Sequence, residues 1–375
     1  MPLIFLLLFV VDLIGVAYPL LAYFLWREWD HYNGSFNQGY ADRCLYAALA
    51  VLLFSLVGRI LIKTLISKRR KGEDEPQMFS PRRSEQLARP DGTVINIEYY
   101  GKEEGPAIIF VHGWNATIKN WYYQWRYFDS KYRLIMMDLP GLGKSTRPLN
   151  KDFSLSKLAD DLHAVIQHSG AKTPVLWGHS IGGMTILTLL GKISGKPNSP
   201  SIGAAVLQHT TYTNPLRTII FSKLMTALQK PVLEPLCWLM IALSPLLWIL
   251  RWMSYLNGNS LIMTRLLTFA GTQTPQQLDF TTLLSTLAPP AVTARGVLGM
   301  FRYDVTNELP KMHLPVFIVA ANKDLLTKPE ASQYMFHHLP NARMTTVEPA
   351  GHQGLMERHN QVNSAVEEFI ESVSS

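Results

Sequence analysis

The feature that most constrains the fold of this chain is a series of short apolar runs separated by segments with helical periodicity. Each run is rich in Val, Ile, Leu and Phe, and the runs lie at 93–100, 107–113, 133–141, 174–180, 204–210, 315–321 and 343–349. Between two of them, residues 152–169 repeat Leu, Val and Ile at helical spacing on one side. Buried strands that alternate with helices predict an α/β fold, in which a mostly parallel sheet is covered by helices on both faces.

This alternation stops between residues 212 and 300, a stretch that is rich in Leu, Met and Trp and has no strand pattern. A helical insertion after a strand would lie over the carboxyl edge of the sheet, where α/β proteins place their sites. We therefore predict a helical lid at 212–300. Its apolar part, 231–256, is interrupted by Pro235 and Pro245. A third membrane span is an alternative there, but it would put the lid and the last strands on opposite sides of a membrane. Lid helices that line a pocket, pack together or contact a bilayer are the preferred interpretation.

Two long apolar segments precede the alternating region. Residues 2–26 carry Asp12 as their one charge, and residues 44–66 are uncharged up to Gly58. Both segments are long enough to cross a hydrocarbon core of about 30 Å, so a transmembrane helical hairpin is predicted over 1–66. A cleaved signal peptide is the alternative for the first segment. It would need a basic start and a shorter apolar run, and no Lys or Arg precedes this one.

Charges near the hairpin predict its orientation. Arg59 and Lys63 would extend toward the headgroups at the end of the second span. The sequence Lys-Arg-Arg-Lys at 68–71 follows at once, whereas the polar stretch 27–43, predicted as the loop of the hairpin, contains fewer basic residues. The positive-inside rule then predicts an integral membrane protein with the rest of the chain on the cytoplasmic side. Asp12 either faces the second helix as a protonated or hydrogen-bonded group or pairs with Arg59.

Composition excludes some classes of function. The net charge is +7, with 47% hydrophobic and 17% charged residues, but most of the excess positive charge lies at 59–89, just after the second apolar segment. No basic stripe with interleaved aromatic residues is present, so nucleic-acid binding is not expected. Cys44 and Cys237 have no disulfide or metal spacing and are interpreted as buried small hydrophobes. The charged, Pro-containing stretch 67–92 is interpreted as a linker. The predicted organisation is hairpin 1–66, linker 67–92, core 93–211, lid 212–300 and core 301–375.

The strongest motif is Gly178-His179-Ser180-Ile181-Gly182. It follows an apolar run directly and precedes a helical pattern, so Ser180 would lie on a sharp turn between strand and helix. Glycines at 178 and 182 leave room for such a turn. The helix that begins here would direct unpaired N–H groups and the positive end of its dipole at the reacting centre. Ser180 is therefore the candidate nucleophile.

A second loop is expected to complete the site. The run at 107–113 ends in His112-Gly113-Trp114, and the backbone N–H groups of Trp114 and Ile181 are the candidate oxyanion donors. One such donor contributes about 3 kcal/mol of transition-state stabilisation. His112 stands beside a tight glycine turn, and we expect it to hold the loop by hydrogen bonds rather than to act as a base.

The candidate acid and base follow the last two runs. Asp324 and His352 both stand just past strand ends, where their side chains can converge on Ser180. A carboxylate on one ring nitrogen fixes the tautomer that lets the other nitrogen accept the serine proton. Asp138 precedes the nucleophile and is expected to shape a loop, and Asp279 and Asp304 have no strand before them. No H-E-x-x-H motif or paired Cys/His spacing occurs, so no catalytic metal is predicted.

Together these residues resemble the α/β-hydrolase superfamily, in its general esterase and lipase-like group. The matching motifs are HGW at 112–114, DLPGLGKS at 138–145, GHSIGG at 178–183, ANKD at 321–324 and AGH at 350–352. The resemblance covers roughly residues 93–375 and includes the lid. It implies hydrolysis through an acyl-enzyme without a cofactor. Relatives that open epoxides or cleave carbon–halogen bonds have aspartate at the position of Ser180, so those reactions are not expected.

The predicted function is a membrane-anchored serine hydrolase that cleaves carboxylic esters, with a small-molecule or lipid-derived apolar ester as substrate and the lipid bilayer as partner. Amide, thioester and carbon–carbon cleavage, and cofactor-free perhydrolase activity, use similar machinery and stay open. A non-catalytic ligand-binding or interaction module of the same fold is the alternative from another class. The sequence does not determine the acyl chain length, the membrane or the oligomeric state.

Overall fold

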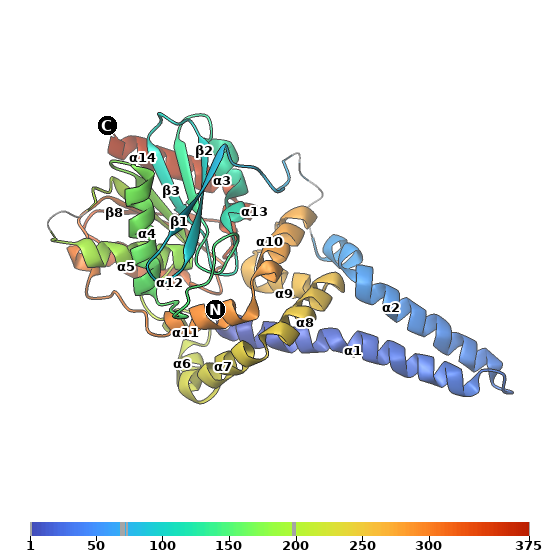
Figure 1. Cartoon of the computed structure of the whole chain (residues 1–375). Helices are drawn as coiled ribbons and strands as arrows, with labels where there is room; N and C mark the ends of the chain where they lie inside the picture. The colour runs from blue at the N-terminus through green and yellow to red at the C-terminus, as the bar shows by residue number, and fades with distance from the viewer. Residues whose placement is uncertain (1, 68–71, 73, 197–199, 375) are drawn as a thin grey trace.

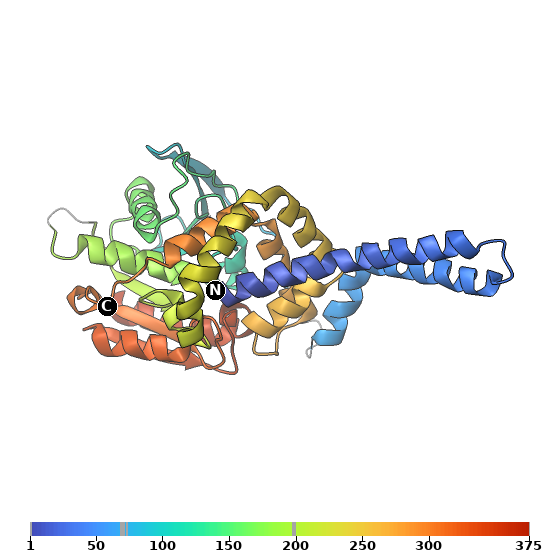
Figure 2. The ribbon, with the colours of Figure 1, turned by 90° about the horizontal axis from the view of Figure 1, so that it is seen from below.

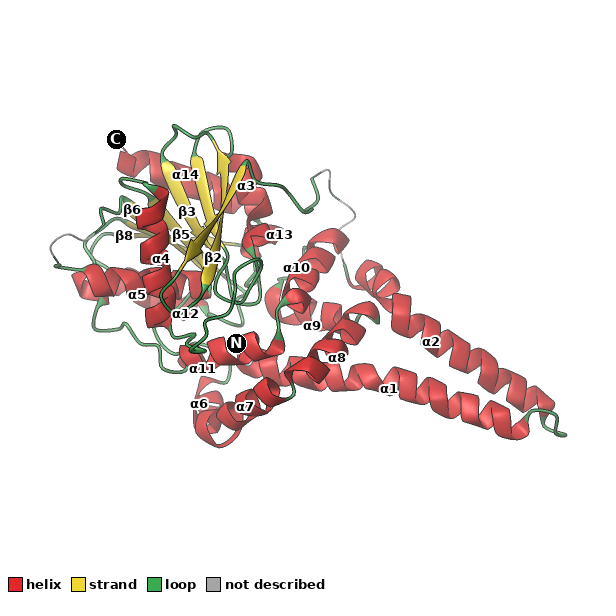
Figure 3. Ribbon diagram, viewed as in Figure 1, coloured by secondary structure: helices red, strands yellow, loops and turns green. Residues whose placement is uncertain are grey.

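The structure, a computed structural model, describes residues 2–67, 72, 74–196 and 200–374, without the side chains of residues 2–9, 12 and 374. Eight strands form one sheet in the order β1-β2-β4-β3-β5-β6-β7-β8 (Figures 1 and 3). Their bounds are β1 Arg83–Ala88, β2 Val94–Gly101, β3 Ala107–Val111, β4 Arg133–Met137, β5 Val175–His179, β6 Ala204–Gln208, β7 Val316–Ala321 and β8 Ala342–Val347. The β1–β2 and β2–β4 pairs are antiparallel and the other pairs are parallel. The predicted mostly parallel sheet is confirmed.

Both faces of the sheet are buried because successive side chains of a strand point to opposite faces. In β3, Ile108 and Phe110 belong to one apolar cluster, and Ile109 and Val111 belong to the other. The helices α3 (Tyr122–Phe128), α13 (Gly354–Glu357) and α14 (His359–Ser374) cover the first face, and α4 (Leu155–Ser169), α5 (Ile181–Ile193) and α12 (Pro329–His338) cover the second. This two-sided burial explains why the runs are nearly continuous in apolar residues.

Strand β1 lies within the stretch that the sequence pattern assigns to a linker. Its residues RSEQLA are largely exposed, and the strand pairs with β2 at the edge of the sheet. An edge strand with little burial has no apolar alternation, so its backbone pairing with β2, rather than its side chains, makes it a strand. The interpretation of 83–88 as linker is therefore corrected.

The region between β6 and β7 is helical, as predicted. It contains α6 (Ser222–Leu228), α7 (Glu234–Ala242), α8 (Ser244–Leu256), α9 (Asn259–Thr268), α10 (Pro275–Leu287) and α11 (Pro290–Met300). Within the apolar segment 231–256, the axis bends by 93° between α7 and α8. These two helices bury Cys237, Met240, Leu247 and Leu250 against the rest of the protein. The segment is thus two packed lid helices rather than one straight span.

The N-terminal region forms two long antiparallel helices, α1 (Pro2–Tyr32) and α2 (Gln38–Ile66), which project from the lid side of the molecule (Figures 1 and 2). The polar stretch 27–43, expected as a loop, is mostly helical. Only a short turn separates the helices, and Gly34 in it has φ +81°, a conformation that glycine adopts without steric cost. Among the described residues, α2 is the one single helix long and apolar enough to cross a membrane.

The two N-terminal helices hold the end of α8. A Cβ on Gly58 of α2 would lie 2.7 Å from the carbonyl oxygen of Asn257, so only glycine permits this approach. Gly258 has φ +90° and lies against Ile62. On the other side, the Tyr18 hydroxyl donates to Asn259 Oδ1 at 3.3 Å. The lid is therefore packed directly on the N-terminal helices.

Two cations of α2 pair with a carboxylate of the lid. Arg59 Nη1 lies 3.0 Å from Asp279 Oδ1, and Lys63 Nζ lies 3.0 Å from Asp279 Oδ2. The Tyr255 hydroxyl also donates to Asp279, at 2.9 Å. A lid carboxylate on α10 thus pairs with both cations, and their position at the level of the headgroups stays a prediction. The alternative partner, the Asp12 side chain, and the basic residues 68–71 lie outside the described residues.

Candidate active site

Ser180 occupies a strained turn between β5 and α5. Its backbone has φ 54° and ψ −120°, a combination that non-glycine residues rarely adopt outside functional sites. A Cβ on Gly178 would lie 2.5 Å from the carbonyl carbon of Gly182, and a Cβ on Gly182 would lie 2.0 Å from the carbonyl oxygen of Val111. Larger residues at 178 and 182 would therefore push the helix off the sheet and release the turn.

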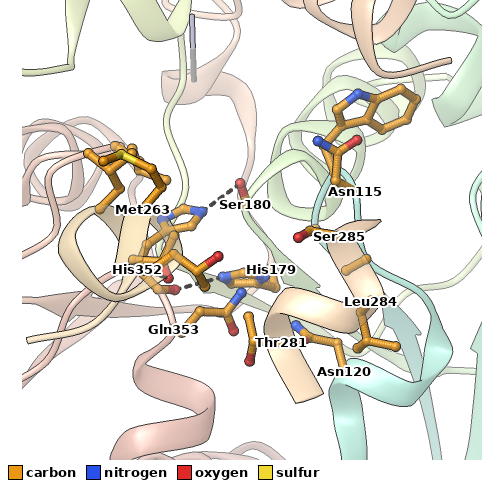
Figure 4. A pocket seen from close by; sticks show the side chains of 17 residues that line it. Asn115, Asn120, His179, Ser180, Met263, Thr281, Leu284, Ser285, His352 and Gln353 are labelled. Atoms are coloured by element: carbon orange, nitrogen blue, oxygen red, sulfur yellow. Dashed lines mark hydrogen bonds between the residues drawn. The ribbon is translucent and has the colours of Figure 1, made fainter. Parts of the chain in front are cut away.

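The side chains of Ser180, His352 and Asp324 form one hydrogen-bonded line, although they come from three strand ends. The Ser180 hydroxyl lies 3.0 Å from His352 Nε2, and His352 Nδ1 lies 2.8 Å from Asp324 Oδ2. All three side chains are buried, and Figure 4 shows the His352 ring directed at the Ser180 oxygen. The three residues singled out in the sequence are thus brought within hydrogen-bond distance.

Asp324 is held as a carboxylate. Burial alone would disfavour its ionisation. The adjacent His352 ring and the surrounding hydrogen bonds outweigh this effect and lower its pKa to about 2. Its Oδ1 accepts from the backbone N–H groups of Leu326 and Thr327, and its Oδ2 also accepts from the Thr327 hydroxyl at 2.8 Å. This set of donors leaves the carboxylate one orientation, toward His352.

The backbone of His352 is held by two further histidines. His179 Nε2 lies 3.0 Å from the His352 carbonyl oxygen, and His209 Nδ1 lies 3.1 Å from the same atom. Both rings are buried, and burial lowers the pKa of His179 well below its usual value and that of His209 to about 4. Each neutral ring can therefore donate one N–H to this carbonyl. The sequence indicated His179 only as part of the turn and did not indicate His209.

The two predicted oxyanion donors belong to segments next to Ser180, the helix α5 that follows it and the loop after β3. The backbone N–H groups of Trp114 and Ile181 donate to no other described residue, as expected for the first N–H of a helix and for a loop amide left unpaired. The Trp114 indole donates to the carbonyl of Thr293 in α11 at 3.0 Å, which fixes the loop. Gly113 lets this loop lie close to the end of β5, since a Cβ there would lie 2.7 Å from His179 Nδ1.

Other candidates from the sequence have structural partners. Both ring nitrogens of His112 are used: Nδ1 lies 2.8 Å from the Gly113 carbonyl oxygen, and Nε2 accepts from the Leu139 N–H at 3.0 Å. Asp138 accepts from the N–H groups of Ile118 and Lys144. His112 and Asp138 thus hold loops, as expected. Among the described residues, no group of three or more His, Cys, Asp or Glu is placed to hold a metal.

A pocket opens beside Ser180 and passes under the lid (Figure 4). Its walls come from the loop at 113–116, from η1 (Ile118–Trp121), from α9 and α10, and from the residues after Asp324 and His352. Apolar side chains line much of it, namely Trp114, Met263, Leu267, Leu284 and Leu326. An apolar pocket next to a buried hydroxyl suits a hydrocarbon chain attached to a reactive carbonyl.

Glu357 joins the lid to the loop that carries His352, and sequence patterns missed it. Its Oε1 accepts from the Gly351 and Ala270 N–H groups, and its Oε2 accepts from the Thr272 hydroxyl at 3.0 Å. Its position in the helix after His352 gives no signal of this role, because the partners lie on the lid segment far away in sequence. Asn120, Thr281 and Gln353 of the pocket wall were also missed, because only the folded chain brings these three residues together.

The sequence profile of the alpha/beta hydrolase fold matches residues 106–359. The chain belongs to the alpha/beta hydrolase family. The predicted fold class, an alpha/beta hydrolase fold with a helical N-terminal region, is thereby confirmed.

Curated relatives match parts of this alpha/beta hydrolase. The bifunctional esterase/perhydrolase DCH of Acinetobacter calcoaceticus is 31% identical over 118 residues, which are 31% of this chain and 41% of that protein. Epoxide hydrolase 4 of Homo sapiens is 33% identical over 85 residues, which are 22% of this chain and 24% of that protein. The matches thus span less than half the length of these relatives.

Solved structures resemble this hydrolase over most of their length. A thermophilic esterase from Thermogutta terrifontis has a TM-score of 0.63 and 20% identity, with 78% of this chain and 100% of that chain covered. A membrane phospholipase A, described as a bacterial virulence factor, has a TM-score of 0.61 and 18% identity, with 89% of this chain and 95% of that chain covered. At these identities the likeness shows the fold.

Proposed function

We propose that this alpha/beta hydrolase is a membrane-anchored serine hydrolase that cleaves carboxylic esters of apolar acyl groups through an acyl-enzyme. The observation that carries the proposal is the hydrogen-bonded line from Ser180 through His352 to Asp324 beside an apolar pocket. Nucleophile, base and orienting carboxylate in this order are the requirements for acyl transfer.

In the proposed reaction, Ser180 Oγ attacks the ester carbonyl carbon while His352 Nε2 accepts its proton. Asp324 holds the Nδ1–H of the ring and stabilises the imidazolium that forms. The N–H groups of Trp114 and Ile181 donate to the carbonyl oxygen as it becomes negative. His352 then gives its proton to the leaving alkoxy oxygen, which leaves Ser180 acylated. Water, activated by the same ring, attacks the acyl-enzyme and releases the acid.

We further propose that α1 and α2 are two membrane spans and that the hydrolase lies on the cytoplasmic side. Support comes from the length and apolar surface of α2 and from the cluster of basic residues at 68–71 in the sequence. The lid that packs on these helices also exposes large apolar side chains, among them Trp238, Leu246 and Ile249. In this arrangement the pocket lies close to the bilayer, which favours lipid-derived esters.

A fluorophosphonate probe tests the reaction. The full-length wild type is expected to be labelled covalently and to hydrolyse p-nitrophenyl esters of graded chain length, whereas Ser180→Ala does neither. Equal labelling of both would remove Ser180 as nucleophile. No labelling of a folded wild type would favour the non-catalytic binding module. Protease protection of the hydrolase in sealed vesicles of known orientation tests the side of the membrane.

A further inference from the structure

The pocket beside Ser180 has a polar wall as well as an apolar one. Besides the hydrocarbon side chains described above, Asn120, His179, Thr281 and Gln353 line it. Figure 4 shows these four side chains gathered on one side, below the Ser180–His352 pair in that view. They come from η1, β5, α10 and the residue after His352. We call them the polar subsite.

Each member of the polar subsite has a buried polar atom without a hydrogen-bond partner among the described residues. The atoms are Oδ1 and Nδ2 of Asn120, Nδ1 of His179, Oγ1 of Thr281 and Oε1 of Gln353. The exposed fractions of the four residues are 1%, 1%, 6% and 8% in that order. Buried polar groups in native proteins are nearly always hydrogen-bonded, so unpaired atoms gathered on one pocket wall point to a ligand that pairs with them.

Neighbouring residues of α10 show that the unpaired hydroxyl of Thr281 is an exception. The hydroxyl of Thr282 donates to the Leu278 carbonyl at 2.7 Å, and the hydroxyls of Ser285 and Thr286 both donate to the Thr282 carbonyl. Threonine in a helix commonly makes this bond to the preceding turn. Thr281 makes none and instead lines the pocket.

The chemistry of the subsite selects a neutral partner that both donates and accepts. No Asp, Glu, Lys or Arg occurs among the described residues that line the pocket. His179 Nε2 donates to the His352 carbonyl, so its Nδ1 carries a lone pair and accepts. The amide of Asn120 and the hydroxyl of Thr281 do both. A buried phosphate or ammonium group would lose its hydration here without a counter-charge. Free hydroxyl groups, in contrast, can form a hydrogen bond with each unpaired atom of the subsite.

We propose that the polar subsite binds free hydroxyl groups on the alcohol part of the ester, so that the substrate class is acyl esters of a short neutral polyol such as glycerol. The inference rests on the proposed ester hydrolysis. The acyl chain lies along Met263, Leu267 and Leu326, and the polyol lies against Asn120 and Thr281. The ester carbonyl between them is then within reach of Ser180.

The test compares two esters of one acyl chain. For the full-length protein in detergent micelles, kcat/KM is measured with 1-decanoylglycerol and with propyl decanoate, which lacks the two free hydroxyls. Wild type is expected to prefer the glyceryl ester by at least about tenfold. Thr281→Val and Asn120→Leu each lower this ratio about three- to tenfold, because each removes one hydrogen-bonding side chain. Thr282→Val, the same change on a hydroxyl already bonded within α10, keeps the wild-type ratio.

The outcomes separate this inference from the proposed function. If both esters are hydrolysed by wild type but not by Ser180→Ala, ester hydrolysis stands. Equal rates for the two esters, or an equal ratio in Thr281→Val and Thr282→Val, would then overturn the polar subsite alone. A preference for 1-decanoyl-glycerophosphate over 1-decanoylglycerol would overturn its neutrality. Hydrolysis of neither ester by labelled, folded protein would remove both ideas. Fluorophosphonate labelling of each variant checks that its site is folded.

Discussion

The carboxyl edge of the sheet and the helical lid beside it are held by different kinds of contact. At the sheet edge, Ser180, Asp324 and His352 each follow a strand, so strand order and register determine where they lie. In the lid, α10 is held by α2 through Arg59 and Asp279, which are 220 residues apart in sequence. Substitutions at the first region should therefore stop the chemistry, and substitutions at the second should change stability and the shape of the pocket.

The largest effect on activity is expected at the carboxyl edge of the sheet. Asp324→Asn should lower kcat by about 10⁴-fold, because an amide no longer enforces the His352 tautomer that accepts the serine proton. The far-ultraviolet circular dichroism spectrum and the melting temperature should show a folded protein. Steady-state hydrolysis of a p-nitrophenyl ester measures kcat of the variant and of wild type.

A carboxylate with other partners provides the matched control for this variant. Asp304 accepts from Thr213 and Arg217 rather than from a histidine, so Asp304→Asn should keep most of the activity. A comparable loss of kcat in both variants would assign the effect to folding and would contradict the role of Asp324.

The sheet edge should also carry a pH-dependent part of the stability. The folded-state pKa of Asp324 is lowered to about 2 from 3.8, so the ionised carboxylate stabilises the fold above about pH 4, and this contribution is lost as the pH falls through 2. It amounts to about 2 kcal/mol. Denaturant unfolding of wild type and Asp324→Asn between pH 5 and pH 2 measures it. A stability difference between the two proteins that does not shrink toward low pH would contradict it.

The contribution of the lid to stability is tested at the ion pairs of Asp279 with α2. Asp279→Asn leaves Arg59 and Lys63 without their carboxylate and should destabilise the protein by about 1 to 2 kcal/mol, since the cluster is partly buried. Thermal unfolding in nanodiscs measures this. Glu330→Gln, which removes the exposed partner of Lys328, is the control and should change stability by less than about 0.5 kcal/mol. Equal shifts in both melting temperatures would mean that α2 does not hold the lid.

The smallest effect is expected behind the site, at the ring that supports His352. His209→Leu leaves the His352 carbonyl with one donor and should lower kcat about three- to tenfold with little change in KM. His209→Asn keeps a donor and suits the positive φ of 47° at this position, so it should recover most of the activity. Pre-steady-state acylation kinetics measure both. If the Asn variant is as slow as the Leu variant, the hydrogen bond to the carbonyl is not what matters.

Much of the sheet could be predicted from the sequence because its strands are buried on both faces. The predicted runs contain β2 to β8, apart from single residues at the strand ends, since such strands must be apolar throughout. β1 could not be predicted in this way, because an edge strand with exposed side chains carries no pattern. The turn at Ser180 was predictable because strand, glycine and helix signals coincide within a few residues.

The sequence by itself determined the fold class, the order Ser180, Asp324, His352 and their positions after strands, because these follow from local periodicity and short motifs. Only the tertiary structure decided which groups meet across long separations. It paired Arg59 and Lys63 with Asp279, set His179 and His209 on one carbonyl, and gathered the unpaired atoms of the polar subsite. Such contacts depend on how helices pack, and packing leaves no periodic trace in a single sequence.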